Sequence, residues 1–203
     1  MSPYRFSLVL AVLVSMAPAA QARQTEASVA ITPAQPADTV GRIEVLEFFS
    51  YSCGPCATMD PLIEKWASAA PADVTFKRVP VAFNASLKPQ QQLYYTLSGL
   101  GRLDLHPKVF EAIHVKRERL RDRKAIVAWA SEQGLDRSAF EAMFDSFGVQ
   151  TQVQRADQLV KAYQMDGTPS FAVGGRYLTS PAMANGYEAA LQEVDRLIPL
   201  VRN

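Results

Sequence analysis

The sequence predicts an α/β fold that carries an inserted group of helices, and three stretches support this prediction. Residues Ile43–Phe49 form a nearly continuous apolar run, which is typical of a central strand covered on both faces. Residues 84–156 then show helical periodicity in several short apolar stripes. Strand character resumes at Ser170–Val173. Helices that stand in a row between sheet segments indicate an insertion within an α/β domain.

The composition limits the class of protein. The chain has 203 residues and 48% apolar content, which suffices for one core or for a domain with an insertion. Lys and Arg together number 21 and Asp and Glu 20, so the overall charge does not favour a nucleic acid or an acidic partner. We therefore expect no nucleic-acid binding.

Residues 1–22 have the features of a secretory signal peptide. Arg5 supplies the positive charge, and the apolar stretch Phe6–Ala17 is too short to span a bilayer comfortably. Ala20-Gln21-Ala22 fits a cleavage site, so we expect the mature chain to start at Arg23. The alternative is a retained membrane anchor. Residues 23–39 are rich in Ala, Thr, Gln and Pro without periodicity, which predicts a flexible N-terminal segment.

Two cysteines, Cys53 and Cys56, directly follow the apolar strand and are the only cysteines of the chain. A disulfide across so short a loop would stabilise the fold by only roughly 2 kcal/mol. A small secreted protein that uses disulfides as a scaffold has more of them. Reactivity therefore explains this pair better than stability does. An inert disulfide and half of a metal site are the alternatives, and zinc would need two further ligands.

A helix is predicted directly after the first cysteine. Apolar residues recur at three- and four-residue steps from Ala57 to Ala70, so Cys53 would lie at a helix N-terminus. Unpaired N–H groups and the helix dipole there favour a thiolate, the nucleophile in disulfide exchange. Pro55 would lie in the first turn of the helix, where the missing N–H of proline costs no hydrogen bond. Gly54 has no side chain that could block access to the Cys53 sulfur. Cys56 would then be the resolving thiol.

With these residues in view, the chain resembles the thioredoxin superfamily, and more narrowly the DsbA-type periplasmic thiol:disulfide oxidoreductases. The resemblance rests on the run Val45–Ser50 before the cysteine pair, on the helices that follow and on Thr168-Pro169 near the far end. It implies a thioredoxin fold divided into residues 40–83 and 157–203, with residues 84–156 as the inserted helical subdomain. It also implies a periplasmic location.

The resemblance assigns roles to further residues. It implies a cis-proline loop in which the Thr168 backbone binds an extended substrate and Pro169 keeps competing groups away from the sulfurs. Glu47 stands in the apolar strand, where an unpaired carboxylate tends to hold a proton. It would either pair with Arg78 on the next strand or help move protons to and from Cys56, and both can hold.

Several weaker expectations concern single positions. Sequences that resemble capping boxes, Ser138–Glu141 and Thr151–Gln154, predict two helix starts. The mixed-charge run Lys116–Lys124 predicts a solvated loop or helix end. The remaining residues fall into two sets, namely surface histidines without assigned chemistry (His106, His114) and candidates for an apolar rim around the sulfurs (Tyr51, Phe83, Met183).

Together these observations predict an exported thiol:disulfide oxidoreductase that needs no cofactor or metal. Its substrates would be unfolded secreted proteins with cysteines. If it is an oxidase, the resemblance implies a quinone-linked membrane partner, similar to DsbB, that re-oxidises it. Gly54-Pro55 resembles thioredoxin, so a reductase or isomerase is the alternative. A chaperone-like or metal-carrying binding module is a second alternative. We expect a monomer.

Overall fold

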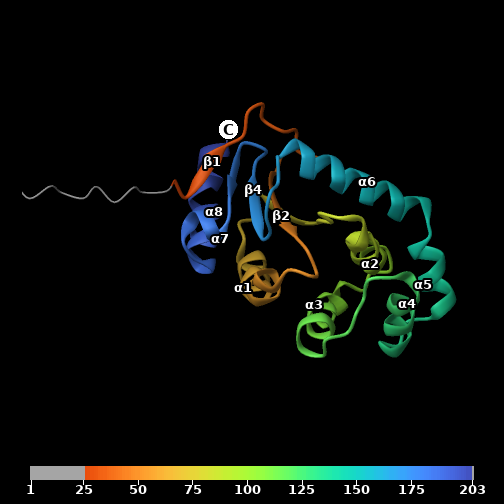
Figure 1. Ribbon diagram of the computed structural model, residues 1–203. Helices are drawn as coiled ribbons and strands as arrows, with labels where there is room; N and C mark the ends of the chain where they lie inside the picture. Colours follow the sequence, from red (N-terminus) through yellow and green to blue (C-terminus); the bar gives the residue numbers. More distant parts are fainter. Residues whose placement is uncertain (1–25, 203) are drawn as a thin grey trace, which may run out of the picture.

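The computed structural model describes residues 26–202, which fold around a five-stranded mixed sheet (Figure 1). The strands lie in the order β1-β5-β4-β2-β3. Strand β2 runs parallel to β3, and the other pairs are antiparallel. All seven residues of β2 are buried, which confirms it as a central strand. The strands span Ser28–Ala30 (β1), Ile43–Phe49 (β2), Val74–Pro80 (β3), Ser170–Val173 (β4) and Tyr177–Thr179 (β5).

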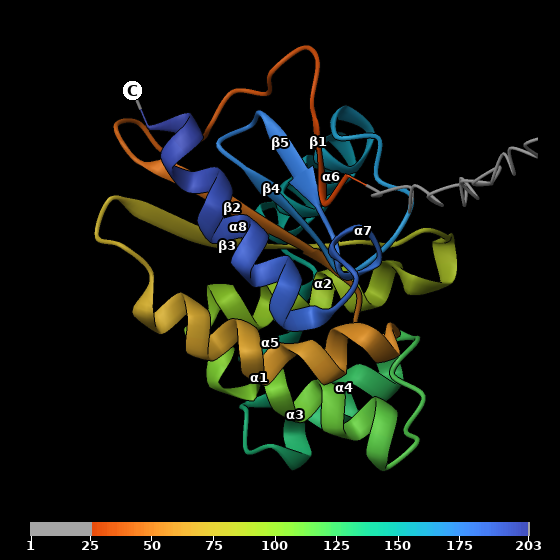
Figure 2. The same ribbon diagram turned by 90° about the vertical axis from the view of Figure 1, so that its left-hand side faces the viewer.

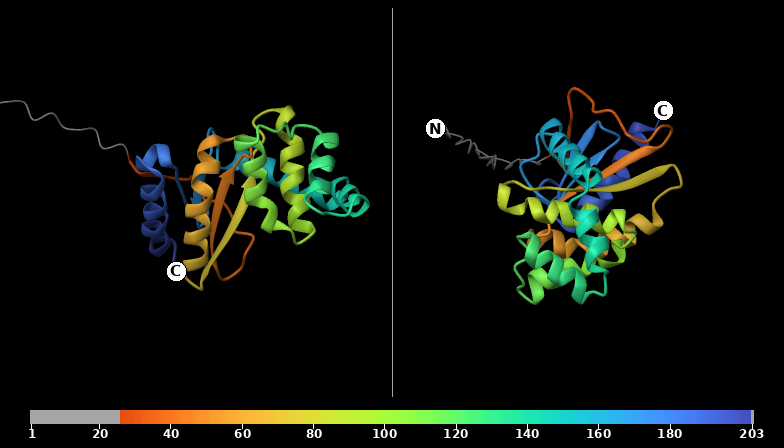
Figure 3. Two further views of the ribbon diagram at one scale, coloured as in Figure 1. Left: turned by 90° about the horizontal axis from the view of Figure 1, so that it is seen from below. Right: turned by 90° about the vertical axis from the view of Figure 1, so that its right-hand side faces the viewer.

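Helices cover both faces of this sheet. Helices α1 (Gly54–Ala69) and α8 (Tyr187–Val201) lie together on one face (Figure 3), and α6 (Phe147–Ala162) packs on the other. Successive side chains of β2 point to opposite faces of the sheet, as in any strand. Val45 packs in the core under α1 and α8, whereas Leu46 and Phe48 pack in the core under α6.

The expected helical insertion is present as a group of helices beside the sheet (Figures 1 and 2). Its apolar core also contains Phe49 and Cys56, so the insertion packs directly against the cysteine loop. Its helices are η1 (Ala85–Leu87), α2 (Lys88–Gly99), η2 (Leu103–Leu105), α3 (His106–Phe110), the π-helix η3 (Glu111–Val115), α4 (Arg123–Glu132) and α5 (Arg137–Phe144).

The expected end of the insertion at residue 156 falls inside the continuous helix α6. Ala156 and Leu159 belong to the core of the sheet, while Asp157 accepts hydrogen bonds from Gln91 and Lys88 of the insertion. Helix α6 therefore joins the thioredoxin part to the insertion. One of its faces packs on the sheet, and the neighbouring face contacts α2.

Both capping-box predictions were wrong. Helix α5 begins earlier, where the Asp136 side chain accepts a hydrogen bond from the Ala139 N–H. Helix α6 is capped by Ser146, and Thr151 lies within it and donates to the Phe147 carbonyl. Several residues near each helix start could serve as caps, and the packing of the helix decided which one does.

The N-terminal segment differs from its expected irregular structure. Residues Ser28–Ala30 form strand β1, which pairs with β5 from the other end of the chain. The Thr179 hydroxyl also donates to the Ala27 carbonyl at 2.6 Å. Local composition did not predict this strand, because its partner lies about 150 residues away. The predicted signal peptide and its cleavage site lie outside the described residues.

The C-terminal part follows the prediction closely. Gly174 and Gly175 form the turn between β4 and β5 with φ values of 57° and 67°. A Cβ at Gly175 would lie 1.9 Å from the Gln35 carbonyl oxygen, so only glycine fits there. A short helix, α7 (Pro181–Ala184), precedes α8. Among residues 26–202, the helices are all too short or too polar to cross a bilayer.

Candidate functional site

The cysteine pair lies at the N-terminus of α1, as predicted. Cys53 is the N-cap residue, and its Sγ accepts a hydrogen bond from the Cys56 N–H at 3.1 Å. The two cysteines form a disulfide with their Cα atoms 5.2 Å apart. In the reduced protein the same N–H and the helix dipole would stabilise a Cys53 thiolate. The start of helix α1 thus places the Cys56 N–H as a hydrogen-bond donor to the Cys53 sulfur.

The two sulfurs differ in exposure. Cys56 is fully buried in the core that the insertion shares with Phe49, whereas Cys53 is only partly buried. Gly54 and Pro55 are exposed, and a Cβ added at Gly54 would meet no atom within 4 Å. Cys53 is therefore the sulfur that solvent can reach, whereas Cys56 is enclosed.

The Thr168-Pro169 segment faces this accessible sulfur. Its peptide bond is cis, and the Thr168 carbonyl oxygen lies 3.3 Å from the Cys53 Sγ. The same loop borders a groove of about 560 Å³, which Pro55 lines from the other side. The remaining walls come from the residues before β4 and from the region of α7 and the start of α8. The groove therefore borders the turn between the two cysteines through Pro55.

Glu47 lies beneath α1 in a buried cluster of charges. The Arg78 guanidinium donates hydrogen bonds to Glu47 at 2.9 Å, to Asp60 at 3.2 Å and to Glu64 at 2.8 Å. Glu47 and Asp60 are buried, and the Arg78 side chain is only 11% exposed. The expected Glu47–Arg78 pair is therefore confirmed. Asp60 lies one turn beyond Cys56 on α1, so the cluster extends towards the buried sulfur.

Burial raises the pKa of Glu47 to about 7, although the Arg78 guanidinium opposes this shift. Nearby Asp60 and Glu64 raise the pKa further, because one guanidinium serves three carboxylates. Near neutral pH this side chain can therefore gain or lose a proton inside the protein.

His106 was expected at the surface, and this prediction was wrong. Its ring is buried, with Nδ1 2.8 Å from the Tyr51 hydroxyl and Nε2 3.2 Å from Asp60. Burial lowers the pKa of His106, which favours the neutral ring. When the Tyr51 hydroxyl donates to Nδ1, the proton of a neutral ring lies on Nε2, which faces Asp60. No local pattern indicates this role, because the periodicity of helix α3 does not mark position 106 as apolar.

Other surface predictions had mixed outcomes. Tyr51 is buried rather than part of a rim, because its ring packs against Phe49, His106 and Phe110. Phe83 is exposed, and neither it nor Met183 lines the groove beside the cysteines. His114 is partly buried, with Nε2 2.8 Å from the Tyr51 carbonyl oxygen. The basic run forms a loop that leads into α4, as expected.

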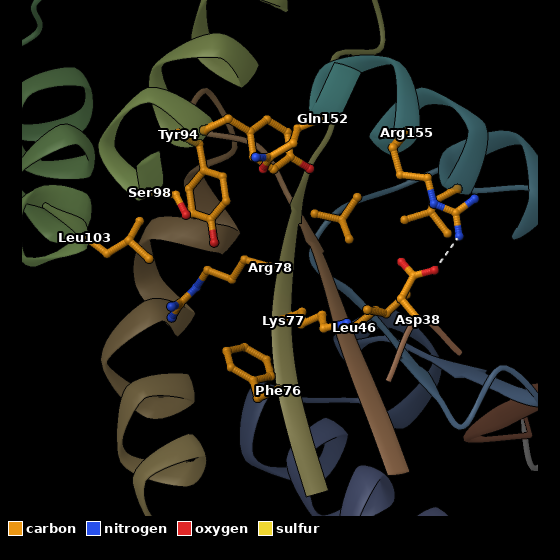
Figure 4. A pocket seen from close by; sticks show the side chains of 13 residues that line it. Asp38, Leu46, Phe76, Lys77, Arg78, Tyr94, Ser98, Leu103, Gln152 and Arg155 are labelled. Atoms are coloured by element: carbon orange, nitrogen blue, oxygen red, sulfur yellow. Dashed lines mark hydrogen bonds and ion pairs between the residues drawn. The ribbon is translucent and has the colours of Figure 1, made fainter. Parts of the chain in front are cut away.

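A second cavity of about 440 Å³ lies along β3, at the open edge of the sheet (Figure 4). Tyr94, Arg78 and Phe76 border it on one side of the strand, and the ion pair between Arg155 and Asp38 borders it on the other (Figure 4). Its lining contains no residue of the cysteine loop or of the Thr168-Pro169 segment, so it lies apart from the disulfide site. Among the described residues, no three His, Cys, Asp or Glu side chains are grouped to hold a metal ion.

The geometry of a disulfide at a helix start, opposed by a cis-proline loop, agrees with comparisons with known proteins. The DSBA-like thioredoxin domain model matches residues 44–192. This chain belongs to the DSBA-like thioredoxin domain family. It is 59% identical over 190 residues to the thiol:disulfide interchange protein DsbA of Bordetella parapertussis, covering 93% of this chain and 91% of that protein. It is 34% identical over 200 residues to the protein of the same name from Pseudomonas aeruginosa, covering 95% of each.

Solved structures of this DSBA-like family share the fold. The crystal structure of Pseudomonas aeruginosa DsbA matches with a TM-score of 0.83 and 33% identity, over 86% of this chain and 92% of that one. The oxidoreductase DsbA from Xylella fastidiosa matches with a TM-score of 0.80 and 29% identity, over 86% of this chain and 95% of that one. The thioredoxin fold with a helical insertion is therefore confirmed.

The raised pKa of Glu47 predicts a specific dependence of stability on pH. Between its ordinary value of 4.5 and about 7, the folded protein holds this proton more tightly than the unfolded chain does. The free energy of unfolding should therefore fall as the pH rises through this window, by up to about 3 kcal/mol from this group. Glu47→Gln should remove that part of the decrease, measured by urea unfolding of the oxidised protein at pH 5 and pH 8.

The exposed Glu132→Gln is the matched control for this experiment, because its side chain lies at the end of α4 in solvent. It should keep the pH dependence of the unaltered protein. An equal decrease in the Glu47→Gln protein would show that Glu47 is ionised across the whole range.

The buried hydrogen bonds of His106 predict a second effect on stability. His106→Phe fits the surrounding aromatic rings but leaves the Tyr51 hydroxyl without its partner. We expect the free energy of unfolding to fall by about 1–3 kcal/mol. Adding Tyr51→Phe removes the orphaned hydroxyl and should restore part of the loss in the double variant. Additive losses from the two substitutions would contradict the proposed hydrogen bond.

Proposed function

We propose that this protein is an exported thiol:disulfide oxidoreductase that introduces disulfides into secreted proteins. The observation that carries the proposal is the Cys53–Cys56 disulfide, with one accessible and one buried sulfur, facing the cis Thr168-Pro169 bond. The names of the Bordetella and Pseudomonas relatives support the same activity. No part of the exchange reaction requires a cofactor or a metal, because thiols and disulfides are its only reactants.

The reaction consists of two thiol–disulfide exchanges. A substrate thiolate attacks the Cys53 Sγ, which forms a mixed disulfide and releases Cys56 as a thiolate. A second substrate thiolate then attacks the substrate sulfur of that mixed disulfide, which releases Cys53 as a thiolate. The substrate loses two electrons and two protons, and the enzyme gains them as two thiols.

The environment of Cys53 favours this direction of electron flow. The Cys56 N–H and the positive end of α1 stabilise the Cys53 thiolate, which appears in the reduced protein. Stabilising the reduced form makes the disulfide a stronger oxidant. Gly54 and Pro55 between the cysteines add no further side-chain donor, so the backbone supplies this stabilisation.

The cis-proline loop would hold the substrate during attack. The Thr168 backbone lies beside the sulfur, where it can form hydrogen bonds with an extended segment, and Pro169 cannot donate an N–H to the sulfurs. Gly54 leaves room for the substrate backbone, and Pro55 forms the opposite wall of the groove. The groove would accept many sequences because it relies on backbone contacts.

Glu47 would act as a proton reservoir for Cys56. When Cys56 leaves as a buried thiolate it requires a proton, since burial disfavours its charge. Glu47 is the buried acid with a pKa near neutrality, and its charge cluster reaches α1 through Asp60. Its protonated form would also lower the cost of burying two carboxylates, those of Glu47 and Asp60, around Arg78.

The biological setting follows from the activity. The protein would work as a monomer in the periplasm after removal of residues 1–22. Its substrates would be unfolded secreted proteins with cysteines. Each reaction leaves the enzyme reduced, so a quinone-linked membrane oxidase similar to DsbB would restore the disulfide. The alternative, a periplasmic reductase or isomerase, is favoured by the thioredoxin-like Gly54-Pro55 pair and by Thr168 before the proline, which resembles the disulfide isomerases.

Single cysteine substitutions test the order of attack. Cys53→Ser should abolish the oxidation of a reduced model protein, because no accessible sulfur remains. Cys56→Ser should retain Cys53 and accumulate a mixed disulfide when it is offered an oxidised model protein, visible as a shifted band on a non-reducing gel and by intact mass. Remaining turnover in Cys53→Ser, or a stable adduct through Cys56, would contradict the assignment.

The reduction potential tests the direction of the reaction. We expect a value nearer to the roughly −120 mV of the oxidant DsbA than to the roughly −270 mV of thioredoxin. Equilibration of the mature protein with glutathione buffers, followed by thiol trapping and mass spectrometry, gives this value. A potential near that of thioredoxin would instead identify a reductase, and an electron donor would then be needed.

A further inference from the structure

A basic loop lies beside the cysteine pair, on residues that the exchange reaction does not use. We propose that Arg117, Arg119 and Arg121 bind an acidic segment of the substrate protein close to its reacting cysteine. This inference rests on the proposed function and deepens it, since it names a class of preferred substrates. The loop belongs to the charged run Lys116–Lys124, which carries six basic and two acidic residues although the chain as a whole is near neutral.

The loop is held in a defined position. It connects η3 with α4 and runs beside the N-terminal end of α1 (Figure 2). Leu120 is 2% exposed and belongs to the core of the helical insertion. The Glu118 N–H donates to the Ala112 carbonyl at 2.9 Å. These two anchors hold the backbone, while the arginines on either side of Leu120 are exposed.

The three arginines differ from their neighbours in their pairing. Within the part of the chain that the structure describes, none of them lies within salt-bridge distance of a carboxylate. In contrast, Arg123 pairs with Asp145 and Glu141, and Lys116 pairs with Glu111. Glu118 is the one acidic residue among them, so the loop surface keeps an excess of positive charge.

The arginines line a cavity that reaches the active site. Its volume is about 400 Å³, and its lining includes Ser52, the residue before Cys53. The Ser52 hydroxyl donates to the side chain of the buried Gln90 at 3.0 Å, which forms a polar wall. This cavity and the groove at the cis-proline loop share no lining residue, yet Ser52 borders one and Pro55 the other. A bound polypeptide can therefore contact both while its cysteine meets Cys53.

The chemistry of the cavity favours carboxylates. A guanidinium presents paired N–H donors that match a carboxylate. The N-terminus of α1 adds positive potential on the same side. Charges arranged in this way mainly raise the rate of encounter, so the effect should appear as faster exchange with acidic substrates.

The test compares dithiol peptides that differ only in the residues next to their cysteines, which are Glu, Gln or Lys. We expect Arg117→Gln/Arg119→Gln/Arg121→Gln to slow oxidation of the Glu peptide by roughly five- to tenfold at low ionic strength. The rate with the Gln peptide should stay unchanged, and the Lys peptide should react faster. Salt at about 0.5 M should remove most of the difference, since it screens charges beyond a few ångströms.

The matched control carries the same change in charge at exposed positions elsewhere, Lys65→Gln/Lys161→Gln/Arg176→Gln. It should leave the ranking of the three peptides as it is in the unaltered protein. An equal decrease in the control would mean that net charge, rather than this loop, sets the preference, and would overturn the proposal. The proposal would also be overturned if the substitutions changed the rates of all three peptides by the same factor.

Two further outcomes separate this inference from the proposed function. If the unaltered protein oxidises none of the peptides, the proposed function fails before the loop is tested. If the arginine variant loses binding to phosphatidylglycerol vesicles but keeps its rate with the Glu peptide, the loop serves a lipid surface, and the inference about acidic substrates is overturned. Circular dichroism and unfolding curves should be unchanged in the variant, because all three side chains are solvated.

Discussion

The chemistry of this protein depends on how the first turn of α1 presents its backbone to the Cys53 sulfur. Cys53 is the N-cap residue, Pro55 has no N–H, and Cys56 supplies the donor, which lies 3.1 Å from the sulfur. This arrangement stabilises negative charge on one sulfur and so weakens the disulfide relative to the two thiols. Strand β2 leads directly into this turn, so the position of the sulfur is fixed by the centre of the sheet.

The helical insertion makes the two cysteines unequal. Its apolar core encloses Cys56 together with Phe49 and Tyr51, whereas Cys53 remains at the boundary of that core. The same insertion contributes the loop around Leu120, which adds charged groups next to the site without changing the reacting atoms.

Beneath α1, the buried charges show how a costly feature can be useful. Arg78 pairs with Glu47, Asp60 and Glu64, so positive charge is scarce in this cluster. Burial and this imbalance raise the pKa of Glu47 into the range in which it can exchange protons. His106 completes the cluster through Asp60 and links it to the insertion. Apolar side chains at these positions would avoid the cost of burying charge, but they carry no titratable group.

The sequence by itself determined the central strand and the cysteine pair at a helix start, because these depend on short-range periodicity and on a motif of a few residues. It offered the Glu47–Arg78 pair as one of two roles for Glu47, and the family resemblance supplied the cis Thr168-Pro169 loop. Only the tertiary structure decided that β1 joins the sheet, that His106 is buried and that the arginine loop borders Ser52. Those features depend on contacts between residues far apart in the chain, and such contacts leave no periodic pattern in the local sequence.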